Sequence, residues 1–193
     1  MDVKSGLSGG FLLAYFVMIL AIPADVSAQT PGSAPSLAAP SGVTLTGIIE
    51  CGEGYTSHEL YDIKITLLEV IRGDEAWKRV KEASDSNKPA DADSEYILAR
   101  IRFEYFARGT PGLCVHQVVP EQFAAYSAKG EDYKPALVVL PKPEVRKGLK
   151  SGESLEGWVA FMVAQKDKTP LMSYSADAGG AVQHGGDKWF LLR

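Results

Sequence analysis

A two-residue alternation of apolar and polar side chains runs through residues 95–108 and limits what this chain can fold into. Ile97, Ala99, Ile101, Phe103 and Tyr105 occupy every second position, and the residues between them include charged side chains. Because successive side chains of a β-strand point to opposite faces, this pattern predicts a strand with one face in the core and the other in solvent. Its apolar face therefore needs a second layer to pack against.

Further segments of the chain also carry patterns typical of β-strands. Residues 61–67 alternate in the same way, and the apolar positions then change parity to Leu68 and Val70, which predicts a β-bulge. Further strands are predicted at residues 43–51, 113–119, 122–127, 154–163, 171–175 and 188–192. Residues 74–83 instead carry apolar side chains three and four positions apart, which predicts a helix. About eight or nine short strands with one short inserted helix indicate an all-β antiparallel sandwich.

The N-terminus has the features of an export signal. Residues 11–22 form an unbroken apolar run, which follows a polar stretch containing Lys4 and precedes Pro23 and small residues up to Ala28. A membrane-spanning helix needs about 20 apolar residues, so this shorter run predicts a signal peptide cleaved after Ala28. An uncleaved anchor is the alternative, because the region before the run is only weakly basic. The mature protein is expected to be secreted or periplasmic and not an integral membrane protein.

The rest of the chain divides into a spacer and one domain. Residues 29–41 consist of small residues and prolines that bury little apolar surface, which predicts a disordered spacer. Residues 42–193 have the length of a single domain with a substantial core. The net charge is −4, and the basic residues are dispersed, so neither nucleic acid nor an anionic membrane is an expected partner.

The two cysteines, Cys51 and Cys114, both lie in the predicted exported part. An even number of cysteines in an oxidising compartment indicates a disulfide. Two buried thiols or a metal site are the alternatives, but neither cysteine has another Cys or a His at ligand spacing.

The sequence shows no catalytic constellation and no cofactor motif. Residues 152–157 resemble the G-x-S-x-G nucleophile elbow, but the second Gly comes one residue late and a strand follows where that elbow requires a helix. No glycine-rich phosphate loop is present. We therefore expect a non-enzymatic binding or accessory module, whose partner is an unknown protein or glycan at the cell envelope.

Two alternative functions remain open. A periplasmic metal-binding protein would use His58, His116 and His184, if folding brought these isolated imidazoles together around zinc or copper. An inhibitor or lectin-like recognition domain would use exposed aromatic side chains, and a sugar-stacking platform could draw on the tryptophans at positions 77, 158 and 189.

Four segments occur in a recognisable order. They are residues 61–77, 96–102, 123–133 and 152–161, of which the third contains Phe123, Gly130 and Tyr133 and the fourth reads Gly-Glu-x-Leu-x-Gly. In this order they resemble a widespread bacterial family of secreted and lipid-anchored immunoglobulin-like domains of unknown function.

Members of that family often carry the automatic label of telomeric repeat-binding factors, and their fold is similar to the mycobacterial immunoprotective extracellular antigen. The resemblance implies an immunoglobulin-like β-sandwich and lends no catalytic residues. The chain departs from it in lacking a lipid-accepting cysteine near Ala28, so we expect a free protein.

Overall fold

The computed structural model describes residues 30–52, 58–109 and 112–193. The predicted signal peptide, with its cleavage point after Ala28, lies outside the described residues. Within the described ranges, no helix combines the length and apolar character needed to cross a membrane.

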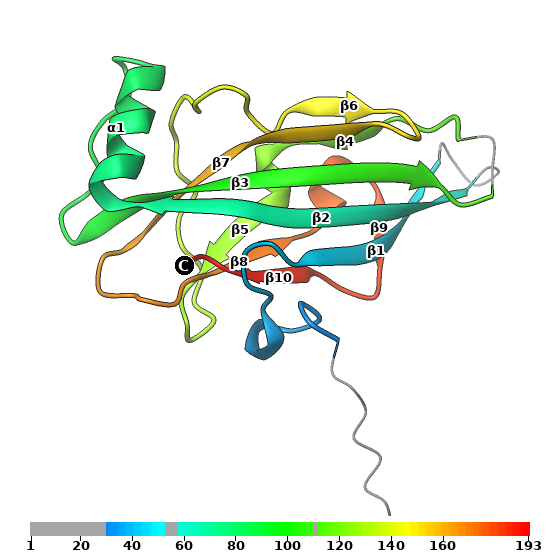
Figure 1. The fold of residues 1–193 in the computed structure, drawn as a ribbon, viewed down its shortest axis with the longest axis horizontal. Coiled ribbons are helices and arrows are strands. Elements are labelled where there is room, and N and C mark those ends of the chain that lie inside the picture. Colours follow the sequence, from blue (N-terminus) through cyan, green and yellow to red (C-terminus); the bar gives the residue numbers. More distant parts are fainter. Residues whose placement is uncertain (1–29, 53–57, 110–111) are drawn as a thin grey trace, which may run out of the picture.

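The larger of the two layers is an antiparallel sheet with the strand order β7-β3-β2-β1-β9. Its strands are β1 (Thr44–Cys51), β2 (Glu59–Arg72), β3 (Ser94–Ala107), β7 (Ser154–Ala164) and β9 (Val182–His184). The long strands β2 and β3 run side by side across the whole molecule, and helix α1 (Gly73–Ala83) lies at one end of them (Figure 1).

The second layer contains two smaller antiparallel sheets, with the orders β10-β8-β5 and β4-β6. Its strands are β4 (His116–Val118), β5 (Phe123–Tyr126), β6 (Lys147–Leu149), β8 (Leu171–Tyr174) and β10 (Lys188–Leu191). Short 3₁₀ helices occur at Pro35–Leu37, Pro120–Gln122 and Asp177–Gly179. One hydrophobic cluster contains residues from both layers. The described part of the chain is thus antiparallel β-structure with one α-helix, as the sequence predicts.

The predicted inward face of β3 forms the centre of that core. All five of its alternating apolar residues, from Ile97 to Tyr105, are fully buried. The predicted bulge in β2 is also confirmed, because its register with β3 shifts between Leu67 and Glu69. Beyond the bulge, Ile71 belongs to a second apolar cluster beneath α1 instead of the main core.

Helix α1 covers part of the outer face of the large sheet. Asp74 and Glu75 lie in its first turn, where carboxylates are stabilised by the helix dipole. Ala76 and Val80 are buried against the second apolar cluster, which includes side chains of β2, β3 and β7. Gly73 begins the helix at a φ of 61°, a conformation that glycine adopts without strain and that lets β2 turn directly into α1.

Residues 30–41 correct the prediction of a disordered spacer. They lie along the edge of β10, where the Ala39 N–H donates to the Trp189 carbonyl at 2.9 Å and the Leu191 N–H donates to the Ala39 carbonyl at 2.8 Å. Ala39 itself is buried. The prediction failed because the segment is ordered by backbone hydrogen bonds to an edge strand, which side-chain composition does not report.

The predicted disulfide between Cys51 and Cys114 is present, with Cα atoms 6.2 Å apart and a sequence separation of 63. It joins the end of β1 to the segment before β4. Backbone hydrogen bonds hold that segment in place: the Leu113 N–H donates to Glu59 Oε2 and the Cys114 N–H to Tyr61 Oη, both at 2.9 Å. The Tyr61 hydroxyl in turn donates to Glu59 and is the main cause of a lowered pKa of that carboxyl.

Phe161 tests which face of β7 points into the core, because its side chain is buried between the layers. We expect Phe161→Ala to lower the free energy of unfolding by about 3–5 kcal/mol, because it leaves a cavity in the core. The same substitution at Phe106, which is exposed on the outer face of β3, should cost about 1 kcal/mol or less. Urea unfolding measures both, and a loss below about 1 kcal/mol for Phe161→Ala would contradict the assignment.

The disulfide should stabilise the fold by restricting the unfolded chain. Replacing both cysteines by alanine is expected to lower the free energy of unfolding by about 2–4 kcal/mol. Reduction of the parent protein should lower it by a similar amount, whereas the same reductant should leave the double variant unchanged. A parent protein whose denaturant midpoint does not respond to reduction would refute this role.

Candidate functional site

The three histidines proposed as metal ligands do not meet. His58 Nδ1 lies 2.7 Å from Glu50 Oε1, and His184 Nε2 lies 3.0 Å from Glu50 Oε2, whereas His116 is buried in the core. Among the described residues, no group of three or more His, Cys, Asp or Glu side chains is arranged to hold a metal ion. The hypothesis of a metal site formed by all three histidines is therefore wrong.

The His116 side chain packs among aromatic side chains in the core. Its ring packs 5.7 Å from the Phe103 ring and 5.6 Å from the Tyr105 ring, and its Nε2 lies 3.1 Å from Tyr174 Oη. Its Nδ1 has no hydrogen-bond partner among the described residues. Burial lowers the pKa of His116 to about 4, so the imidazole is neutral at physiological pH.

A groove beside α1 is the best candidate for a binding site. Its volume is about 580 Å³, within the range of small-molecule sites. It is bordered by the start of α1, the segment before β3, the first residues of β3 and the turn after β7. The side chains that line it include Asp74, Trp77, Asp91, Tyr96, Gln165 and Lys168.

Two aromatic rings from different elements meet at this groove. Trp77 of α1 and Tyr96 of β3 stack with ring centroids 5.9 Å apart and 20° between their planes. The Tyr96 hydroxyl donates to the Lys88 carbonyl at 3.0 Å, which ties the segment before β3 to the sheet. Burial, helped by the charge of Asp91, raises the pKa of Tyr96, so its hydroxyl remains a neutral donor.

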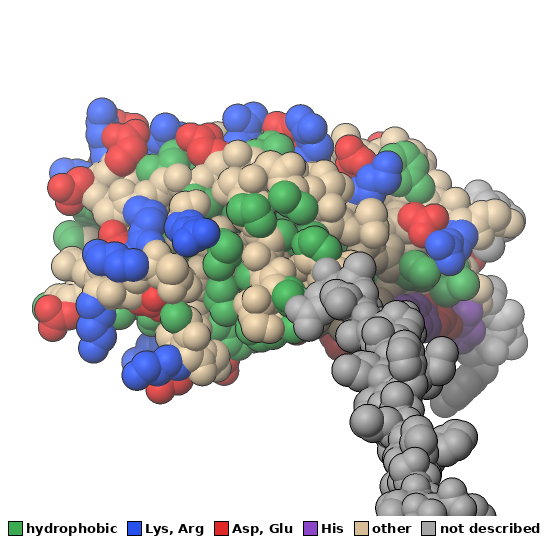
Figure 2. Space-filling view, turned by 60° about the horizontal axis from the view of Figure 1, so that its bottom comes forward, with side chains coloured by type: hydrophobic (Ala, Val, Ile, Leu, Met, Phe, Trp, Pro, Cys, Tyr) green, Lys and Arg blue, Asp and Glu red, His purple; other side chains and the backbone are tan. Residues whose placement is uncertain are grey.

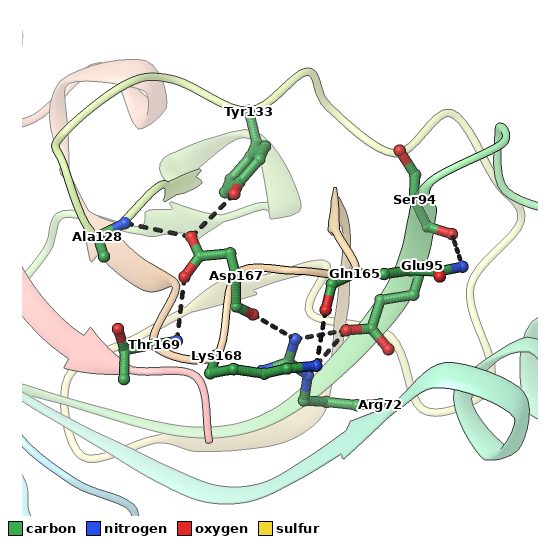
Figure 3. Close-up of polar contacts among 9 residues, drawn as sticks. All are labelled: Arg72, Ser94, Glu95, Ala128, Tyr133, Gln165, Asp167, Lys168 and Thr169. Atoms are coloured by element: carbon green, nitrogen blue, oxygen red, sulfur yellow. Dashed lines mark hydrogen bonds and ion pairs between the residues drawn. The ribbon is translucent and has the colours of Figure 1, made fainter.

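An ion pair joins Glu95, which lines the groove, to Arg72 of the neighbouring strand. The Arg72 guanidinium, at the end of β2, pairs with the Glu95 carboxylate at the start of β3, and both side chains are mostly buried. The same guanidinium donates to the Asp167 carbonyl at 2.8 Å, which attaches the turn after β7 (Figure 3). Gln165 Nε2 donates to the Ser94 carbonyl at 3.0 Å and fixes that turn a second time.

The Asp167 side chain extends this network to the turn between β5 and β6. Its Oδ2 accepts hydrogen bonds from the Tyr133 hydroxyl at 2.8 Å and from the Ala128 N–H at 3.2 Å, and its Oδ1 accepts one from the Thr169 N–H at 3.0 Å (Figure 3). Burial and the bond to Asp167 raise the pKa of Tyr133 to about 12. Four segments distant in sequence are thus held in one arrangement, so the groove is formed before any ligand arrives.

A second groove, of about 470 Å³, adjoins the first and shares Pro89, Asp91 and Tyr96 with it. Its remaining wall is more apolar and includes Leu137 and Met162, together with the side chains of Lys88 and Lys134. Leu137 is 94% exposed, so this side of the molecule presents an uncovered apolar side chain next to the groove. Figure 2 shows that apolar, basic and acidic side chains are interspersed over the face it displays.

The three tryptophans do not form the predicted common platform. Trp158 is buried beneath the Arg79 guanidinium, which lies 5.4 Å from its ring, and Trp189 packs against Tyr126 in the second layer with centroids 5.0 Å apart. Only Trp77 borders the groove. Its partner Tyr96 was predicted as a strand residue and not as part of a site, because no local pattern reports that α1 folds back onto β3.

Comparisons with known proteins do not assign the chain to a family. No family model matches it, and no curated protein matches it. Two solved structures from Bacillus subtilis are similar: ycdA, a suggested lipoprotein, with 13% identity and a TM-score of 0.46 over 67% of this chain, and yjhA, with 12% identity and a TM-score of 0.47 over 80% of this chain. The chain spans 35% of the ycdA chain and 99% of the yjhA chain. Similarity at this level identifies neither family nor function.

The burial of His116 predicts a loss of stability in acid. Its pKa is 6.5 ordinarily and about 4 in the folded protein, so between these values the unfolded chain binds a proton that the folded chain does not. Stability therefore falls as pH falls, by about 2 kcal/mol for this group between about pH 7.5 and about pH 5.

Urea unfolding at both pH values measures this slope. His116→Gln should flatten it, because the variant lacks the buried imidazole. An NMR titration of the parent protein supplies an independent check: protonation of the His116 ring near its ordinary pKa would contradict the prediction.

Proposed function

We propose that the chain is an exported, non-enzymatic recognition module on an immunoglobulin-like β-sandwich, and that the groove bordered by Trp77 and Tyr96 is its ligand site. The sandwich is supported by two antiparallel layers that enclose one core. Export is supported by the predicted signal peptide and by the Cys51–Cys114 disulfide, which is typical of oxidising compartments.

The observation that carries this proposal is the aromatic pair at the groove. Trp77 is only partly buried although it stacks on Tyr96, so part of a large apolar ring faces the groove and remains available to a ligand. The Arg72–Glu95–Asp167 contacts hold both aromatic elements in place, and a preformed site loses less conformational entropy on binding.

The chemistry of the groove favours binding over catalysis. Ser94 borders it, but His58 and His184 contact Glu50 and His116 lies in the core, so no imidazole among the described residues activates this hydroxyl. The Glu95 carboxylate is engaged by Arg72. These groups can position a ligand, and none is paired as a nucleophile with its base.

Trp77→Ala tests the proposal. Residues 29–193, carrying the disulfide, are immobilised and exposed to a cell-envelope fraction of the source organism, and bound material is quantified over a dilution series. We expect the variant to bind about tenfold more weakly than the parent, because a partly exposed aromatic anchor is lost. Phe106→Ala removes an exposed aromatic side chain outside the groove and should bind like the parent.

Trp77 also packs on Tyr96, so the variant must be shown to be folded by its thermal unfolding curve. Trp77→Phe keeps a ring at this position and should recover part of the binding. Equal binding by the parent and a folded Trp77→Ala variant would overturn the assignment of the groove as the ligand site.

A further inference from the structure

We infer that the ligand of the Trp77–Tyr96 groove is a neutral saccharide with vicinal hydroxyl groups; this inference rests on the proposed function of the groove. It is based on the geometry of the aromatic pair, on the mixture of hydrogen-bonding groups around it, and on the continuity of two adjacent grooves.

The aromatic geometry suits a flat ring better than a cation. Cations such as quaternary ammonium groups are recognised by cages of aromatic side chains around the charge. Trp77 and Tyr96 are nearly parallel and stack on each other, so they do not enclose such a cage. Tyr96 is buried, so a ligand would contact the exposed part of the Trp77 ring. A pyranose ring presents flat apolar patches of C–H groups together with hydroxyls at its edge, and it can lie against this part of Trp77.

The polar groups at the groove match hydroxyls, which both donate and accept hydrogen bonds. Asp74 and Asp91 supply acceptors, and neither carboxylate forms an ion pair with a cation of the described residues. Each carboxylate has two oxygens, so it can accept hydrogen bonds from two neighbouring hydroxyls. Gln165 and Lys168 supply donors at the same groove.

The charges at the groove disfavour the competing ligand classes. The unpaired carboxylates of Asp74 and Asp91 repel phosphate and acidic polymers. Lys168, whose Nζ donates to the Gln165 carbonyl at 2.8 Å, borders the first groove, and Lys88 and Lys134 border the second, so basic side chains oppose a cation at both grooves. A ligand without net charge but rich in hydroxyls meets neither penalty.

The second groove allows a ligand longer than one ring. The two volumes, about 580 and 470 Å³, share Tyr96 and Asp91, so a bound chain can continue past Tyr96 toward the apolar wall at Leu137. A second sugar unit would place its apolar face there.

The test uses the immobilised domain and the envelope fraction described above, with half of the fraction oxidised by periodate and then quenched. Periodate cleaves vicinal diols, so we expect the Trp77-dependent binding to fall at least tenfold after oxidation and to survive protease digestion. Binding of a neutral saccharide should change little when ionic strength is raised about tenfold, because salt screens charges and not stacking.

The variant Asp91→Asn distinguishes binding of a saccharide from binding of a cation. An amide keeps one acceptor oxygen but removes the charge, so saccharide binding should weaken by about threefold, whereas binding of a cation should weaken by about tenfold or more. Trp77-dependent binding that survives periodate and declines with salt overturns the saccharide inference and leaves the groove as a binding site. Binding that does not depend on Trp77 at all overturns both.

Discussion

Burial of the inward faces of β2 and β3 against the second layer determines where the other elements lie. The alternating residues of both strands fill the core, so the intervening residues must face outward. The bulge between Leu67 and Glu69 changes which side of β2 faces the core and sends Ile71 outward. That end of the outer face is consequently apolar, and α1 covers it. The groove exists because the helix covers only part of this apolar area and leaves Trp77 and Tyr96 at its margin.

Polar and covalent contacts hold the two ends of the long strands in different ways. At the end near α1, the Arg72–Glu95 pair is mostly shielded from water and gains a further hydrogen bond from Arg72 to the Asp167 carbonyl. Such a pair contributes more to a defined geometry than to net stability, because desolvation offsets much of its attraction. At the opposite end the Cys51–Cys114 disulfide acts mainly on the unfolded chain. The groove lies at the end near α1, where the Arg72–Glu95 pair fixes the relative positions of the surrounding segments.

Local patterns predicted most of the fold. The alternation along residues 95–108, the parity change after Leu67, the helix at residues 74–83 and the paired cysteines all reflect neighbours in sequence or a simple count, and the structure confirms each of them. Residues 30–41 could not be predicted, because their order comes from backbone hydrogen bonds to β10 and from the burial of Ala39, both of which depend on a distant strand.

The site was predicted less well because it is formed by long-range contacts. Arg72 reaches the Asp167 carbonyl across 95 positions of sequence, and Trp77 meets Tyr96 only when α1 folds back on β3. The metal-site hypothesis grouped the three histidines because they share the same ligand chemistry. The sequence did not show that His116 would be buried in the core, away from the other two.

A hydrogen-exchange footprint of residues 29–193 tests most directly whether the end of the sheet beneath α1 is the ligand site. Amide exchange is compared with and without the cell-envelope fraction. The account predicts slower exchange at residues 73–77, 89–96 and 165–168, and unchanged exchange around Glu50 and Leu113 at the opposite end. Protection confined to that opposite end would contradict it.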